Sequence, residues 1–138
     1  DKKTSVLETL QSEIFWKKIK NLEFISATKN NILRIVIPPS ECINLIHELP
    51  KQFKYFLDWG GALVWIEACD LSEQMFESIR RRVVRHGGHI TMIKNSDSLP
   101  YVEDVFTINS VRFQISQSIK KSFDPKGILN PGKMYTGI

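Results

Sequence analysis

The chain has 138 residues, of which 42% are hydrophobic and 25% charged, and its formal net charge is +4. This length suits one domain with a single core and is short for a two-domain enzyme, and the composition is that of an ordinary globular domain. The charge is too small to indicate nucleic-acid binding by itself, and no apolar run approaches the roughly 20 residues that span a bilayer.

The first elements alternate between helical and extended patterns. With Thr4 or Ser5 as a cap, a helix is predicted over 4–20 from apolar residues at helical spacing: Leu7, Leu10 and Ile14. A β-branched run at 33–37, ended by two prolines, predicts a strand. Ser40 can then cap a second helix, whose apolar residues share one face: Cys42, Leu45, Ile46 and Leu49.

A β-hairpin is predicted in the middle of the chain. Two runs rich in aromatic and β-branched residues, 53–59 and 62–68, flank the pair Gly60-Gly61. Because two-residue turns of the primed types need positive φ, a Gly-Gly pair in this position is a strong hairpin signal.

The C-terminal half continues the alternation of helices and strands. Ser72 is expected to begin an amphipathic helix, which the glycine pair at 87–88 ends with a left-handed cap. The run 89–94 predicts a fourth strand, and a last helix carries apolar residues about four apart: Val111, Ile115, Ile119 and Phe123. We therefore predict the α+β class, with a ferredoxin-like βαββαβ antiparallel sheet and extra N- and C-terminal helices.

The predicted sheet is apolar on both faces near its middle. Leu33 and Ile35 can face the helices, whereas Val36 and residues that alternate in the hairpin point to the other face: Phe56, Leu63 and Trp65. A sheet with helices on one side usually shows polar residues on the other. This second apolar face is therefore either an interaction surface or a surface that the terminal helices cover.

Few residues indicate chemistry in this chain. None of the three histidines stands in a metal-type pair: His47, His86 and His89. Cys42 and Cys69 are expected to be buried free thiols. Because no nucleophile elbow, phosphate cradle or Cys-x-x-Cys cluster motif occurs, the catalytic residues stay unknown and no metal site is predicted.

Two features could indicate a macromolecular partner. The basic run at 80–85 is either a solvated helix end, which favours cations, or a docking surface for an acidic partner. RNA-recognition domains share the predicted topology, but their third strand needs a basic residue, a glycine and several aromatic residues to stack bases. Because the run 59–66 lacks this pattern, no nucleic-acid partner is predicted.

The most specific segment lies near the end and reads SFDPKGILNPGK over 122–133. Because the residue before a proline avoids the helical region, the last helix should end near Phe123 or Asp124. Asp124 and Asn130 can bond nearby backbone N–H groups, and the glycines permit positive φ. A rigid turn that caps a helix would by itself account for the prolines and glycines.

The complete segment also resembles the C-terminal signature of FAD-linked oxidases of the vanillyl-alcohol-oxidase (PCMH) type. The stretches 57–62 and 86–91 are similar to landmarks of one group of these enzymes, the E-type subunits of bacterial glycolate oxidase. The similarity runs from about residue 14 to the end and corresponds to the C-terminal portion of a longer protein. It implies that residues 1–138 form one cap domain and that the N-terminal FAD-binding module is absent from this chain.

The resemblance also implies a function and a site. In these flavoproteins the cap lays its sheet over the isoalloxazine ring, so the implied cofactor-binding residues are Asn130, Pro131 and Gly132 with Trp59 and Gly60 of the hairpin. The implied function is that of a cap, or substrate-side, domain in an FAD-dependent glycolate oxidase subunit that oxidises a 2-hydroxy acid within a complex. This chain alone is expected to be inactive. The paired-histidine metal motif of the D-type subunits has no match here.

The partners implied are the FAD-binding module, a catalytic flavoprotein subunit and an iron–sulfur subunit. Because the first residues lack the apolar segment of a secretory signal, we expect a cytoplasmic protein that the complex could hold at the inner membrane. An alternative of another class is a stand-alone ferredoxin-like module for interaction or ligand sensing.

Overall fold

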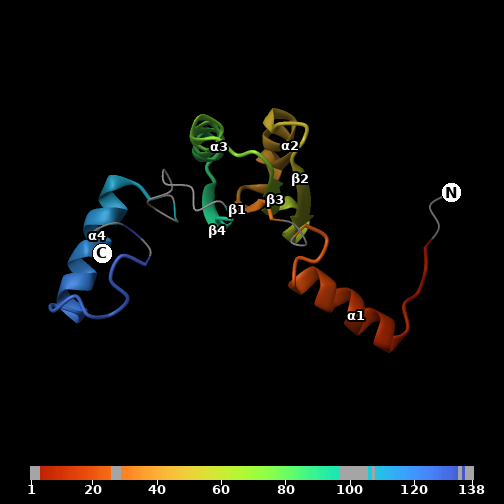
Figure 1. Ribbon diagram of the computed structural model, residues 1–138, viewed down its shortest axis with the longest axis horizontal. Coiled ribbons are helices and arrows are strands. Elements are labelled where there is room, and N and C mark those ends of the chain that lie inside the picture. Colours follow the sequence, from red (N-terminus) through yellow and green to blue (C-terminus); the bar gives the residue numbers. More distant parts are fainter. Residues whose placement is uncertain (1–3, 26–28, 97–105, 107, 134, 136–138) are drawn as a thin grey trace.

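A computed structural model of the chain describes residues 4–25, 29–96, 106, 108–133 and 135 (Figure 1). Helices and strands alternate along it in the order α1 (Thr9–Lys20), β1 (Asn31–Val36), α2 (Pro39–Glu48), β2 (Lys54–Asp58), the 3-10 turn η1 (Trp59–Gly61), β3 (Leu63–Ala68), α3 (Glu73–Arg85), β4 (His89–Lys94) and α4 (Ser110–Phe123). Among the described helices, none has the combination of length and apolar character that crossing a membrane requires.

The four strands form one antiparallel sheet in the order β2-β3-β1-β4. Both central strands are therefore paired on two sides, and α2 and α3 lie together on one side of the sheet (Figure 1). This is the arrangement of a ferredoxin-like β-α-β-β-α-β unit, with α1 before it and α4 after it. The predicted fold class is confirmed.

The core lies between the sheet and this helical layer. On β1 the side chains of Leu33 and Ile35 are fully buried, as are Val64 and Ile66 on β3. Because side chains alternate along a strand, these residues all point to the helices. The helices close the core with one apolar stripe each: Cys42, Leu45 and Leu49 from the first, and Phe76, Ile79 and Val83 from the second.

The helix starts agree with the sequence prediction in one case and differ in two. Ser72 caps α3 as predicted, because its hydroxyl accepts the N–H of Met75 at 3.2 Å. The cap expected at Ser40 is wrong, since Pro39 occupies the first position of α2, where its missing N–H costs nothing. The cap expected at Thr4 or Ser5 is also wrong: α1 begins later, at Thr9, and Glu8 is its N-cap.

The hairpin forms as predicted, but its turn differs. Asp58 pairs with Leu63, which leaves the four residues 59–62 between the strands in place of a two-residue turn. Trp59, Gly60 and Gly61 all have positive φ. A Cβ on Gly61 would lie 3.6 Å from Cys42 of α2, so the loop folds back onto that helix.

A glycine pair ends α3 as the sequence indicated. Gly87 has φ of +74° and donates its N–H to the carbonyl of Val84, while Gly88 donates its N–H to the carbonyl of Val83. These two hydrogen bonds are the pair that defines a Schellman cap. Gly88 also has a tertiary role. A Cβ placed on it would lie 2.6 Å from the carbonyl oxygen of Val36 at the end of β1.

The two terminal helices bury none of their described residues. The last helix begins at Ser110, is capped by Asn109, whose side chain accepts the N–H of Arg112, and ends at Phe123 as predicted. In Figure 1, α1 and α4 extend away from the central unit on opposite sides of it.

We predict that Gly88→Ala destabilises the fold more than Gly87→Ala. An added methyl group at residue 88 would overlap the backbone of Val36, and overpacking of this kind costs up to about 3 kcal/mol. At residue 87 the penalty arises from positive φ alone, about 1 kcal/mol. Urea unfolding of both variants measures the two free energies. Equal losses would contradict the close approach of the helix end to β1.

Candidate functional site

The first candidate surface is the open face, defined as the side of the sheet turned away from α2 and α3. One row of paired residues crosses all four strands on this face: Phe56 on β2, Trp65 on β3, Arg34 on β1 and Thr91 on β4. Their neighbours along each strand point to the core or to the helical side. The centre of the open face therefore carries two aromatic rings and one cation.

The open face is only partly exposed. Phe56, Trp65 and Val36 are half-buried, so their rings and methyl groups remain accessible. Leu63 points to the same face but retains only 3% of its accessible surface, which agrees with the alternative in which part of this face is covered. Register determines the face to which a side chain points, and it does not determine which neighbours lie above that side chain.

The segment that follows α1 covers part of the open face. The ring of Phe24 stacks on Phe56 with centroids 6.1 Å apart, and Phe15 meets Phe24 edge-on at 6.4 Å. An apolar groove of about 600 Å³ lies beside this stack, between α1 and β2. The open face is therefore covered in part: the segment after α1 lies over its β2 edge, and Leu63 and Thr91, farther from that edge, retain 3% and 5% of their accessible surface.

Sequence reasoning missed Arg34. Its guanidinium carbon lies 5.5 Å from the ring centroid of Trp59 and 5.8 Å from that of Trp65, so two indoles flank one cation. The signal that could have found it is a single arginine between Leu33 and Ile35 in an otherwise apolar central strand. Trp59, which the family resemblance assigned to the cofactor, is thus on this face and is 60% exposed.

The second candidate surface is the C-terminal turn, residues 124–133, whose shape depends on Asp124. The carboxylate of this buried residue accepts the N–H groups of Ile128 and Leu129 at 3.1 and 2.9 Å. The ammonium group of Lys120, 2.6 Å away, and these two bonds lower the pKa of Asp124 to about 2. The turn is therefore held by an ionised carboxylate, and it leaves the apolar side chains of Ile128 and Leu129 exposed.

The other predicted cofactor residues lie at the outer end of this turn. Asn130, Pro131 and Gly132 are exposed, and Asn130 has φ of +46°, a conformation that asparagine tolerates better than most residues. Within the described ranges, the side-chain amide of Asn130 makes no hydrogen bond. The turn lies beside α4, apart from the sheet, so this chain does not bring Asn130 together with Trp59 and Gly60 (Figure 1).

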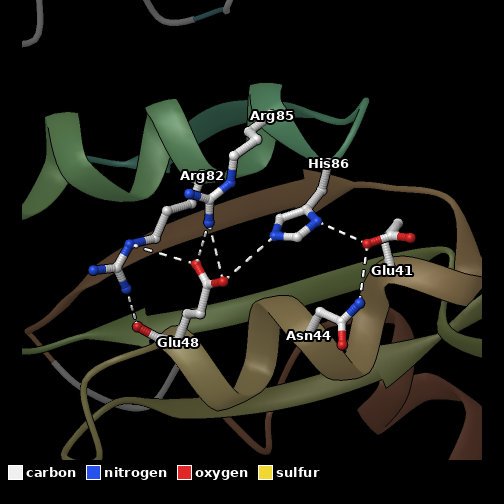
Figure 2. Close-up of polar contacts among 6 residues, drawn as sticks. All are labelled: Glu41, Asn44, Glu48, Arg82, Arg85 and His86. Carbon is white, nitrogen blue, oxygen red and sulfur yellow. Dashed lines mark hydrogen bonds and ion pairs between the residues drawn. The ribbon is translucent and has the colours of Figure 1, made fainter.

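The helical layer carries a separate polar cluster, shown in Figure 2. The carboxylate of Glu48 on α2 accepts two bonds from Arg85 of α3, at 2.8 and 3.0 Å, and lies 3.7 Å from Arg82. His86 contacts Glu41 at 2.7 Å. Two arginines of the basic run thus serve to join α2 to α3, which favours the structural interpretation of that run over docking of an acidic partner.

The same cluster and the thiols offer little chemistry. The amide of Asn44, and then His86, hold the pKa of Glu41 below its usual range, so this carboxylate stays ionised. Both cysteines are free, and burial raises the pKa of the Cys42 thiol, which keeps it a weak nucleophile. In the part of the chain that the structure describes, no group of three or more potential ligands could hold a metal ion.

Two matches to known proteins bear on the sequence prediction. Residues 94–134, which include α4 and the whole C-terminal turn, match the model of the family described as FAD linked oxidases, C-terminal domain. The chain is also similar to the glycolate oxidase subunit GlcE of Escherichia coli (strain K12), with 27% identity over 125 residues. Together these matches support the class predicted from the sequence, a C-terminal cap domain of an FAD-linked oxidase.

The match to GlcE covers the two proteins to different extents. It covers 90% of this chain but 32% of the relative, so the chain spans about a third of the length of GlcE. No solved structure matches the chain.

The ionised state of Asp124 gives a pH prediction. Because its pKa is about 2 in the fold and 3.8 ordinarily, its contribution to stability is present above about pH 4 and is lost as the pH falls towards 2. Carboxyl NMR titration of the chain should show the low pKa directly. In Asp124→Asn the amide signals of Ile128 and Leu129 should shift already at neutral pH, whereas Asp70→Asn, at an exposed position, is the control. An ordinary pKa for Asp124 would contradict the assignment.

Proposed function

We propose that this chain is the cap domain of an FAD-dependent oxidase subunit of the glycolate oxidase type. In this proposal the open face covers the flavin that another module binds, and the assembled protein oxidises a 2-hydroxy acid. The partners would be the FAD-binding module, a catalytic flavoprotein subunit and an iron–sulfur subunit. The complex would be cytoplasmic and held at the periphery of the inner membrane.

One observation carries the proposal. The centre of the sheet is aromatic and accessible on its open face, in a protein whose matches are to a flavin-linked family. Accessible apolar surface of this kind marks a place where another surface packs. The flat rings of Trp59 and Trp65 suit contact with a planar ring system.

The described residues fit only one part of FAD. The exposed indoles suit the isoalloxazine ring, but the glycines with positive φ serve turns and a helix cap, and none forms a cradle for the pyrophosphate. FAD supplies the two-electron oxidation when it is bound. This chain would contribute an apolar cover that excludes water from the ring and positions polar groups above it.

The exposed apolar residues outside the sheet support an assembled state. Ile128 and Leu129 are 71% and 60% exposed, although Asp124 fixes the backbone that carries them. A held turn with an apolar tip is suited to insertion into a partner surface. We infer that this tip, together with Asn130, contacts the flavin module.

The proposal predicts a difference in visible absorption between two proteins. The chain of residues 1–138 should be purified colourless, whereas the product of the complete reading frame should be yellow from bound flavin. Extraction by heat and chromatography identifies and counts the flavin. Stoichiometric flavin on the short chain, or a flavin-free complete product, would contradict the proposal, and the latter result would favour a stand-alone interaction or sensing module.

Asn130 allows a matched test of the C-terminal turn. Asn130→Ala should strain the left-handed backbone and cost about 1 kcal/mol, whereas Asn130→Gly removes the same amide without that strain. If the amide serves the flavin module, both variants of the complete protein should lose flavin affinity, and only the alanine variant should melt at a lower temperature. Flavin binding that is unchanged in the glycine variant would restrict Asn130 to a backbone role.

A further inference from the structure

We propose that Arg34 is the anion-binding residue of the open face and that it takes the carboxylate of a small organic acid. The anion site itself does not depend on the function proposed above. The identity of the acid as a 2-hydroxy acid rests on that function, of which this inference names the substrate-binding group.

The position of Arg34 is the first argument. It lies on β1, which is paired on both sides, with Trp65 as its neighbour on β3 and Thr91 as its neighbour on β4. It is half-buried, so the guanidinium is neither in bulk water nor in the core. A cation in the middle of a sheet face cannot move into solvent as a residue on an edge strand can.

The second argument is that, among the described residues, no acidic side chain pairs with this charge. Glu67, the nearest acidic residue along β3 on the same face, is 3% exposed and is engaged by Lys54 at 3.8 Å and by the amide of Asn30 at 2.8 Å. Within the described ranges, Arg34 takes part in no hydrogen bond or ion pair. Its surroundings differ in this respect from those of Arg82 and Arg85, which both meet Glu48.

The third argument concerns the chemistry of the missing partner. A guanidinium stacked against aromatic rings keeps its N–H groups directed outward in its own plane, where they match the two oxygens of a carboxylate. Partial burial strengthens such a charged pair. Trp59 is held by the N–H bond of its own backbone to Asp58 at 2.8 Å and stays largely exposed, so the site opens to solvent on that side. The half-buried guanidinium is therefore accessible to a small acid from the side of Trp59.

The two indoles also provide the assay. In a Trp16→Phe background the remaining tryptophans are the two that flank Arg34. Fluorescence of this chain is titrated with sodium glycolate at constant ionic strength, with sodium chloride and neutral ethylene glycol as ligand controls. We expect a saturable change with glycolate and none with either control.

Three variants test whether glycolate binding depends on the side chain of Arg34. Arg34→Gln should weaken glycolate binding about tenfold or more, which corresponds to roughly 1.4 kcal/mol. Arg34→Lys keeps the charge but loses the bidentate hydrogen-bond donor, so its affinity for glycolate should lie between those of the parent and Arg34→Gln. Arg81→Gln removes the same charge from an exposed position on α3 and should bind as the parent does. If Arg34→Gln does not fold, as judged by circular dichroism, the Arg34→Lys titration decides.

Three results would overturn the inference. These are a titration without saturation, equal affinity in Arg34→Gln and the parent, or an equal loss in Arg81→Gln, which would indicate general charge. If glycolate does not bind but the complete protein loses its flavin in Arg34→Gln, the residue pairs with a protein or cofactor group and not with a small acid. Arg34-dependent glycolate binding by a complete protein that lacks flavin would instead contradict the proposed function and leave the anion site in place.

Discussion

The structure depends on the packing of one face of a four-stranded sheet against α2 and α3. Leu33 and Ile35 of the central strand β1 are fully buried against α2 and α3, and the strict alternation of side chains then places Arg34 on the opposite face. A register shift of one residue would put this arginine into the core, where an unpaired charge is very costly. The hydrophobic core and the candidate site are thus fixed by the same pairing of β1 with its two neighbours.

Charge is distributed unequally over the two sides of the sheet. On the helical side, Glu48 lies between Arg82 and Arg85, so these two cations of α3 are paired within the fold and help to join the two helices. On the open face, Glu67 is engaged by other residues, and Arg34, which has no ion pair within the described ranges, lies against two indole rings. On the helical side these charges therefore have partners within the fold, whereas the open face has the aromatic and cationic groups that a ligand or a second module would use.

The terminal parts of the chain extend the same asymmetry. The βαββαβ unit has a closed core, whereas α1 and α4 bury none of their described residues and the C-terminal turn holds an apolar tip away from the core. Apolar surface of this extent in elements outside the core is typical of surfaces that pack against another module. Residues 94–134 match an FAD-linked oxidase family, and the chain spans about a third of its relative GlcE.

Local patterns were sufficient for much of this protein. The amphipathic stripe and Ser72 cap of α3, its end at Gly87, the strands, and the stop of α4 before Asp124-Pro125 all follow from hydrophobic period and backbone preference, which act within a few residues. The C-terminal segment indicated the family by the same local means. These features can be predicted from the sequence because each depends only on neighbouring residues.

Other features required the tertiary structure. The hairpin loop takes its four-residue form where Gly61 meets Cys42, and Glu48 meets Arg85 across 37 positions of sequence. Leu63 points to the face that the alternation predicted, but only the structure shows that it is buried there. Arg34 becomes a candidate site only because strand register brings Trp65 beside it and the loop brings Trp59 over it. A sequence pattern determines which way a side chain points, but the groups it meets there are decided by strand register and by helix packing between distant segments.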